Sequence, residues 1–234
     1  MVHYTLRFGL SLSLSILTSV SLNAQTVTRL DPPTSSYESL GYAISPNGTQ
    51  VAGQVGTASG YRAYLWTGSS WIGTNLGTLG SSSIAYGVNN SPKVVGSTSV
   101  TNEICQQGFS WTSSGGMTSL GAITTVARSI SPNGSYIAGI RHGSLPPSTS
   151  PCIGASRGFR NSDNLLPLAN VTLYPISESQ AFGVNDSGIA VGVSQIDPDP
   201  DQGVGYFHAT QWSGTTPTDL GTLGGDNSYA YAIN

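Results

Sequence analysis

Side chains that could perform acid–base or nucleophilic chemistry are few in this sequence, and their spacing does not bring them together. Beyond residue 24 the chain has two histidines, His142 and His208, which lie in different segments. Catalysis requires titratable groups that converge, so we assign neither a catalytic role and expect a structural role for His208. Residues 154–158, GASRG, have the G-x-S-x-G spacing of a nucleophile elbow. They precede a predicted strand instead of a helix, so we interpret the match as chance.

Carboxylates are the other possible source of chemistry, and one stretch holds several of them. Residues 197–203, DPDPDQG, place Asp197, Asp199 and Asp201 at alternate positions, as at the start of a calcium-binding loop. The glycine comes one place late for an EF-hand, and no Glu follows at the twelfth position. We therefore interpret the stretch as a solvated surface loop, with calcium binding as the alternative. A glycosidase needs two positioned carboxylates, and the acids recur at no fixed register. We assign no catalytic, cofactor-binding or metal-binding residue.

The composition indicates a packed protein that does not bind nucleic acid. Charged residues make up 8% of the 234-residue chain, the net charge is −3, and no cluster of Lys or Arg occurs in the sequence. Nucleic-acid binding needs a basic surface that neutralises phosphates, so we expect no nucleic-acid partner. Hydrophobic residues amount to 38%, which is enough for a core.

The N-terminus has the features of a secretory signal peptide. Arg7 precedes an apolar, serine-rich run at residues 8–22, and Leu22 and Ala24 occupy the −3 and −1 positions of a cleavage site. The run is shorter than the roughly 20 residues that span a bilayer, and no later stretch is long and apolar enough to do so. We predict a signal peptide over residues 1–24 and a protein that is secreted or held at the cell surface. A membrane anchor or a buried strand is the alternative.

A short motif recurs five times and determines the expected architecture. Its copies are YAISPNG at 42–48, YGVNNSP at 86–92, RSISPNG at 128–134, FGVNDSG at 182–188 and YAIN at 231–234. The interval is roughly 45 residues, the length of a four-stranded propeller blade. Each copy ends a strand and, except in the last, supplies the Pro, Asn, Asp and Gly of a turn. A second, third and fourth strand then follow.

We therefore predict an all-β, propeller-like array of four-stranded repeats, in a closed or an incomplete ring, with a β-solenoid as the alternative. The expected domain covers residues 25–234. Its units are 40–83, 84–126, 127–179 and 180–228, with the start of a fifth at 229–234.

Two positions recur inside the predicted strands. The second strand of every unit contains a glycine: Gly53, Gly96, Gly139 and Gly192. A glycine in the middle of a strand weakens it, so its recurrence predicts that another backbone approaches closely. The third strand places Tyr64 and Trp66 on one face. We expect each blade to bury this aromatic face on the next blade. In the third unit Asn161 replaces the tryptophan.

Both ends of the repeat region resemble parts of a unit. Residues 26–30, TVTRL, resemble the fourth strand TPTDL at 216–220, so we predict a stray strand that completes the last blade. Residues 229–234 form a predicted first strand that lacks its hairpin partner. Proteins usually avoid such an exposed edge, so we expect the sequence to be a fragment or a truncated reading frame.

The only cysteines, Cys105 and Cys152, both precede the third strand of their units. In a propeller, these loops emerge on one face of neighbouring blades. We therefore predict a disulfide between them, as an oxidising compartment permits, with two separate buried thiols as the alternative.

The fourth unit resembles the HAF repeat family of probable extracellular repeat proteins. Residues 207–214, FHATQWSG, followed by TDLGTLGGDNSYAYAIN, show the likeness. His208 and Ala209 represent the first two residues of the family's His-Ala-Phe triplet, and Thr210 stands in place of the Phe. The resemblance implies export and a repeat array, and it implies no reaction.

We expect a non-enzymatic extracellular scaffold whose loops bind a protein or a glycan, because binding residues concentrate in loops on rigid scaffolds. The alternative is a propeller-type hydrolase that acts on an extracellular glycan or another polymer.

Overall fold

The computed structural model describes residues 29–30, 38–100, 105–142, 156–161, 164–166, 178–196 and 205–234. The predicted signal peptide, Cys152 and the three aspartates of the 197–203 stretch lie outside these residues. All regular structure in the described part is β, in four antiparallel sheets of four strands, which we call blades 1 to 4. The predicted fold class is therefore confirmed. A search of the described residues finds no helix that could cross a membrane.

In every blade the strands follow one another in chain order. Blade 1 contains β1 (Ser39–Ile44), β2 (Gln50–Thr57), β3 (Gly60–Thr67) and β4 (Ile72–Asn75). Blade 2 contains β5 (Ser82–Val88), β6 (Lys93–Val100), β7 (Cys105–Thr112) and β8 (Gly116–Ile123). Blade 3 contains β9 (Thr125–Ile130), β10 (Ile137–His142), β11 (Ser156–Arg160) and β12 (Asn164–Leu165). Blade 4 contains β13 (Ser179–Val184), β14 (Ala190–Ile196), β15 (Tyr206–Ser213) and β16 (Thr216–Asp219).

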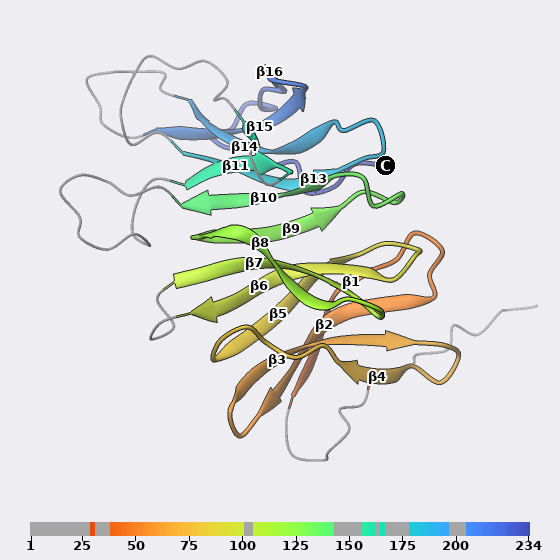
Figure 1. Ribbon diagram of the computed structural model, residues 1–234. Helices are drawn as coiled ribbons and strands as arrows, with labels where there is room; N and C mark the ends of the chain where they lie inside the picture. Colours follow the sequence, from red (N-terminus) through yellow and green to blue (C-terminus); the bar gives the residue numbers. More distant parts are fainter. Residues whose placement is uncertain are drawn as a thin grey trace, which may run out of the picture.

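The blades are stacked in sequence order, from blade 1 at the bottom of Figure 1 to blade 4 at the top. Each blade packs on its neighbours, and the first strands β1, β5, β9 and β13 lie one after another. Blades 1 and 4 share no extensive contact in the described part of the chain, so the array is open. Strands pair within each unit and not between units, which is the pattern of a propeller and not of a solenoid.

Every first strand contains a β-bulge at the same register position. The bulged residues are Tyr42 in β1, Tyr86 in β5, Arg128 in β9 and Phe182 in β13. A bulge bends a strand and redirects a side chain, so the first strands present these four side chains outside the regular pairing with the second strands.

The recurring glycine of the second strand lies opposite this bulge. A Cβ at Gly53 would lie 1.9 Å from the carbonyl oxygen of Leu40, and one at Gly192 would lie 1.9 Å from that of Gln180. The same distance is 2.0 Å at the other two positions, Gly96 and Gly139. The predicted close approach of another backbone is confirmed, and the approaching group is a carbonyl of the bulged strand.

The aromatic face of each blade packs on the preceding blade. Phe109 of blade 2 belongs to one buried cluster with Ala52 of blade 1. Phe159 of blade 3 likewise belongs to a cluster with Val95 of blade 2. The expectation that this face packs on the next blade was wrong in direction. Small residues of one blade, such as Ala52, thus contact the larger aromatic residues of the blade that follows it in sequence.

A hydroxyl near the start of each first strand joins successive blades. The side chain of Ser83 in blade 2 accepts a hydrogen bond from the Ala63 N–H of blade 1 (2.9 Å) and donates one to the Gly77 carbonyl, just after blade 1 (2.6 Å). The next two junctions have the same accepted bond, from the Gly108 N–H to Thr125 (2.8 Å) and from the Gly158 N–H to Ser179 (2.9 Å). Each bond satisfies a backbone amide that would otherwise be buried without a partner.

Residues 228–234 occupy the place of a further first strand on blade 4. Ser228 accepts a hydrogen bond from the Ala209 N–H (2.8 Å) and donates one to the Gly221 carbonyl (2.6 Å), which repeats the bonds of Ser83. The segment forms no strand, because no second strand pairs with it in the described structure. The segment therefore lies where a further first strand was predicted, but it does not have the conformation of a strand.

Of the predicted stray fourth strand at residues 26–30, the structure describes Arg29 and Leu30. Leu30 packs against the front face of blade 1, next to Val51, and its carbonyl accepts a hydrogen bond from the Ser39 hydroxyl (2.5 Å). This is the place that Leu76 takes in front of blade 2. Leu30 itself is not part of a strand.

Candidate functional site

The second strands end and the third strands begin at one end of the array, which we call the loop end. In sequence they are joined by residues 58–59, 101–104, 143–155 and 197–205. The first strands also begin at the loop end, because each pairs antiparallel with its second strand. The connections that begin at this end differ in length from unit to unit. The first strands, which contact one another and which we call the inner strands, start at the same end.

A cavity of about 290 Å³ opens at the loop end between blades 3 and 4, with blade 2 at its edge. Its lining residues come from β7, the β8–β9 turn, β9, β10 and β13: Gln106, Thr124, Val126, Arg128, Ile140, His142 and Gln180. Three separate units thus contribute to this candidate site.

Thr124 forms a rigid part of the wall. Its φ angle is 86°, a conformation that β-branched residues rarely adopt. Hydrogen bonds hold it there: its hydroxyl donates to the His142 carbonyl (2.7 Å), and the His142 N–H donates to the Thr124 carbonyl (2.8 Å). Its own N–H donates to the Gln106 carbonyl. Strained backbone of this kind concentrates at functional sites, where the surrounding structure maintains it.

Arg128 provides the permanent charge of the cavity. Its guanidinium lies over the Tyr86 ring, 4.5 Å from the ring centroid, so a cation–π contact fixes its position. Its Nε atom is buried and has no hydrogen-bond partner in the described structure. Because Arg128 is the bulged residue of β9, the bulge directs the guanidinium towards the cavity.

His142 is half-buried at the end of β10. Burial lowers the pKa of its imidazole below the usual value, and the Arg128 charge lowers it further, while Glu178 acts in the opposite direction. The imidazole is therefore neutral at pH 7 and offers one donor and one acceptor. With Gln106, Gln180 and Thr124 it gives the cavity a mainly hydrogen-bonding lining.

This arrangement can hold a polar ligand through hydrogen bonds and one charge. Five of the seven lining residues are polar, and none of the seven is an Asp or Glu. A neutral histidine and a fixed guanidinium can hold an anionic or hydroxyl-rich group. The described residues also contain no group of three His, Cys, Asp or Glu side chains that could hold a metal ion.

The structure places the two histidines considered from sequence on different blades. His208 lies on β15, where its Nδ1 is 3.1 Å from both carboxylate oxygens of Asp219. Asp219 also accepts a hydrogen bond from the Gly221 N–H (2.7 Å), as Asn75 does from the Gly77 N–H (2.9 Å) at the same place in blade 1. The carboxylate thus stabilises the turn after the fourth strand, and this geometry supports a structural role for His208.

Cys105 begins β7 and is buried. Cys152 lies outside the described residues, so the disulfide stays a prediction. The same holds for calcium at Asp197, Asp199 and Asp201.

The cavity was not found from the sequence, although one sign of it was visible. At the first position of the five motif copies, Arg128 stands where the other copies have Tyr or Phe. An arginine among aromatic residues at a bulge position marks the blade that holds the cavity.

No protein-family model matches this chain, and no curated protein matches it either. The resemblance to the HAF repeat family therefore rests on the motif residues alone.

Proposed function

We propose that this protein is a non-enzymatic extracellular scaffold that binds a glycan or a protein at its loop end. The proposal includes the export expected from residues 1–24 and the membership in the HAF repeat family expected from the motif. The observation that carries it is the use of the repeated residues. The bulge, the opposing glycine and the bridging hydroxyl all serve the packing of blades, which leaves the differences between units at the loop end.

A glycan is the favoured ligand class, because the cavity at this end is small and lined mostly by hydrogen-bonding side chains. A propeller-type hydrolase is the competing candidate. It would need a pair of carboxylates aimed at one substrate bond, and the seven residues that line the cavity supply none.

The test uses the mature protein, purified from culture medium after its start at Gln25 is checked by intact mass. It is incubated with insoluble xylan, cellulose, chitin and pectin, and both the bound protein and the released reducing ends are measured. Retention on a polymer without product release is the expected result. Release of soluble sugars at a rate above that of heat-treated protein would overturn the non-enzymatic role.

A loop variant shows whether the loop end is responsible. Residues 197–205 are replaced by the short connection 58–59 of blade 1, which joins the same two strands of the repeat. We expect a folded protein with altered retention. Unchanged retention of this variant together with loss of retention in a blade 4 surface variant away from this end would place binding elsewhere.

A further inference from the structure

We propose that the cavity between blades 3 and 4 binds the carboxylate of an acidic sugar within an extracellular polysaccharide. This inference rests on the proposed role as a glycan-binding scaffold and specifies the ligand class and the site. The juxtaposition behind it is a guanidinium among hydrogen-bonding side chains, next to a row of aromatic residues on the neighbouring first strands.

The fold concentrates positive charge on blade 3. Four of the eight basic residues of the chain belong to this blade: Arg128, Arg141, Arg157 and Arg160. The described residues of blade 3 include no Asp or Glu. The sequence shows no basic cluster, because these arginines are spread along three strands. Arg141 and Arg157 lie towards the loop end, while Arg160 donates to the Gly188 carbonyl at the other end of the blade.

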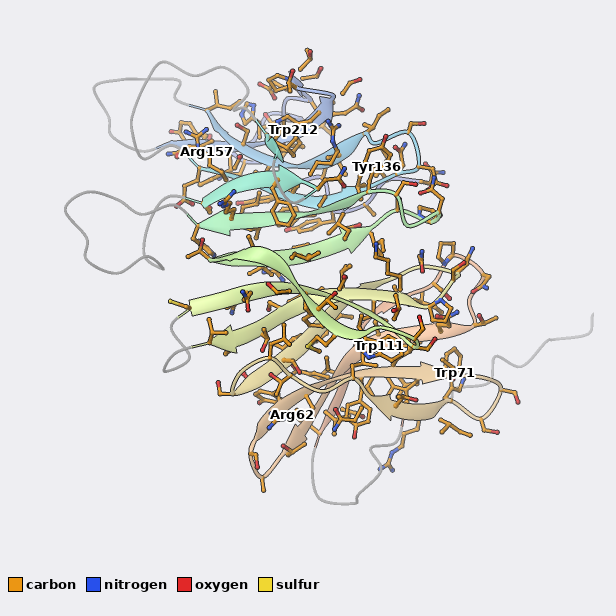
Figure 2. All side chains as sticks on the ribbon, in the orientation of Figure 1. Arg62, Trp71, Trp111, Tyr136, Arg157 and Trp212 are labelled. Atoms are coloured by element: carbon orange, nitrogen blue, oxygen red, sulfur yellow. The ribbon has the colours of Figure 1, made fainter. Side chains whose placement is uncertain are left out.

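Two of these arginines lie directly opposite each other at the loop end. Arg141 of β10 pairs with Arg157 of β11 across the sheet. Like charges in directly opposed positions destabilise a sheet. Figure 2 shows Arg157 on blade 3, where it is the second residue of β11. Both side chains lie on the face of blade 3 opposite to Ile140 and His142, which line the cavity, so the pair adds to the positive potential around the cavity without contacting it. No such pair occurs at the equivalent place in blade 1, where Arg62 faces Val55.

Arg128 is the group that would contact the anion. It lines the cavity, it is held against Tyr86, and its buried Nε has no partner in the described structure. A guanidinium pairs with a carboxylate through two parallel hydrogen bonds, and a pre-positioned guanidinium loses little conformational freedom on binding.

The remaining lining fits a sugar better than an apolar ligand. Gln106, Gln180 and His142 can bond hydroxyl groups, while Val126 and Ile140 offer a small apolar surface to the C–H groups of a ring. The volume, about 290 Å³, is at the low end of ligand pockets, which range from about 300 to 1,000 Å³, so one sugar unit fills it.

A row of aromatic side chains extends from the cavity and favours a polymer over a free sugar. Beyond Arg128 lies Tyr86, and beyond it Tyr42, with ring centroids 5.4 Å apart. Tyr42 is 47% exposed. Tyrosine rings combine an apolar face with a polar tip, so a chain that leaves the cavity along this row can keep both kinds of contact.

The experiment measures binding of the mature protein to immobilised polygalacturonate and to the same polymer fully methyl-esterified, which removes the charge and keeps the backbone. We expect binding to the acid form and at least about tenfold weaker binding to the ester, since the charge-assisted bonds are lost. Dextran sulfate distinguishes a carboxylate site from general attraction to anions. Equal binding to all three polymers, or no binding to the acid form, would overturn the inference.

Matched arginine variants locate the site. Arg128→Gln should weaken binding to polygalacturonate about tenfold or more, and Arg157→Gln about threefold. Arg62→Gln is the control, because Arg62 occupies the place of Arg157 in blade 1 and the change in net charge is the same. Far-ultraviolet circular dichroism verifies folding of each variant. Equal losses for Arg62→Gln and Arg157→Gln would show an effect of net charge only and contradict the site.

The two proposals fail in different ways. Retention on a neutral polymer with no affinity for polygalacturonate would leave the scaffold role intact and reject the acidic-sugar site. Degradation of polygalacturonate would reject the non-enzymatic role while Arg128→Gln still reports on the site.

Discussion

Blades 3 and 4 share the features of their first and second strands but differ in their third and fourth strands. Trp212 of β15 has no exposed surface and packs in a cluster with Ala138 of blade 3. Figure 2 labels Trp212 within blade 4. Asn161 stands at the equivalent place in blade 3, where it is exposed with a φ angle of 57°. β11 ends just before it, and β12 has two residues where β16 has four.

The features that the two blades share lie on the inner side. Both have the bulge in the first strand and the glycine opposite it. We infer that the bulge and its opposing glycine are required for a blade to form, and that the aromatic residue of the third strand determines the length of the third and fourth strands.

Alanine at the inner glycine should disrupt both blades equally. A Cβ at Gly139 or Gly192 would lie within 2.0 Å of a backbone carbonyl oxygen that no side-chain movement can clear. We expect Gly139→Ala and Gly192→Ala each to lower the free energy of unfolding by more than about 3 kcal/mol, the upper range for overpacking. Urea denaturation followed by tryptophan fluorescence measures the loss. Gly225→Ala, which meets no atom within 4 Å, is the control. A large difference between the two blades would refute the shared role.

Truncation at the outer position should distinguish the blades. Trp212→Ala removes a fully buried ring and should cost about 3–5 kcal/mol of unfolding free energy. Asn161→Ala should cost less, about 2 kcal/mol, because it removes one hydrogen bond, from the Ile137 N–H (3.2 Å), and places alanine in a left-handed conformation. The same denaturation series compares both. If the two substitutions cost equally, blade 3 has a core that its outer strands do not reveal.

Restoring the tryptophan in blade 3 should not stabilise it. The left-handed backbone at Asn161 costs a bulky residue about 1–2 kcal/mol, so Asn161→Trp should lower stability by a similar amount. Asn161→Gly, which tolerates this conformation, should be close to neutral apart from the lost hydrogen bond. Thermal unfolding of the two variants side by side is sufficient. A stabilised Asn161→Trp protein would mean that the backbone at residue 161 can leave the left-handed conformation when a tryptophan is present.

The smallest expected effect concerns pH. Burial lowers the pKa of His142 in the folded protein, so the unfolded chain binds a proton more readily. Stability from this group is complete above the unfolded pKa, about 6.5, and is lost as the pH falls from there towards the lower folded pKa. His142→Gln should therefore reduce the loss of stability between pH 7 and mildly acidic pH. Parallel urea titrations at several pH values measure it, and identical pH dependence of the two proteins would contradict the sign.

The parts of the fold that repeat could be predicted from the sequence. Turns such as SPNG and the glycines Gly53 and Gly192 are local and recur at one register, so strand order and the close backbone approach followed from them. The direction of aromatic packing did not follow, because alternation along a strand gives a shared face without saying which neighbour that face meets. The hydroxyl bridges were missed for a similar reason, since Ser and Thr are abundant in this chain.

The candidate site was beyond sequence reasoning because three units contribute to it. Gln106 and Gln180 are separated by a whole blade in sequence, and Arg128 reaches the cavity only through a bulge whose position strand alternation does not reveal. The unusual Arg128 among the aromatic first residues of the motif was the one visible sign.

The bridging hydroxyls have a consequence for how such chains change over generations. Each blade carries near its start the hydroxyl that bonds the preceding blade, as Ser83 and Ser179 do, and contains the amide that the following blade will bond. Duplication or deletion of a whole unit therefore leaves every junction complete, in the manner of arrays whose repeats contact only their neighbours. The number of blades can then vary through recombination of the gene without any compensating substitution at the junctions.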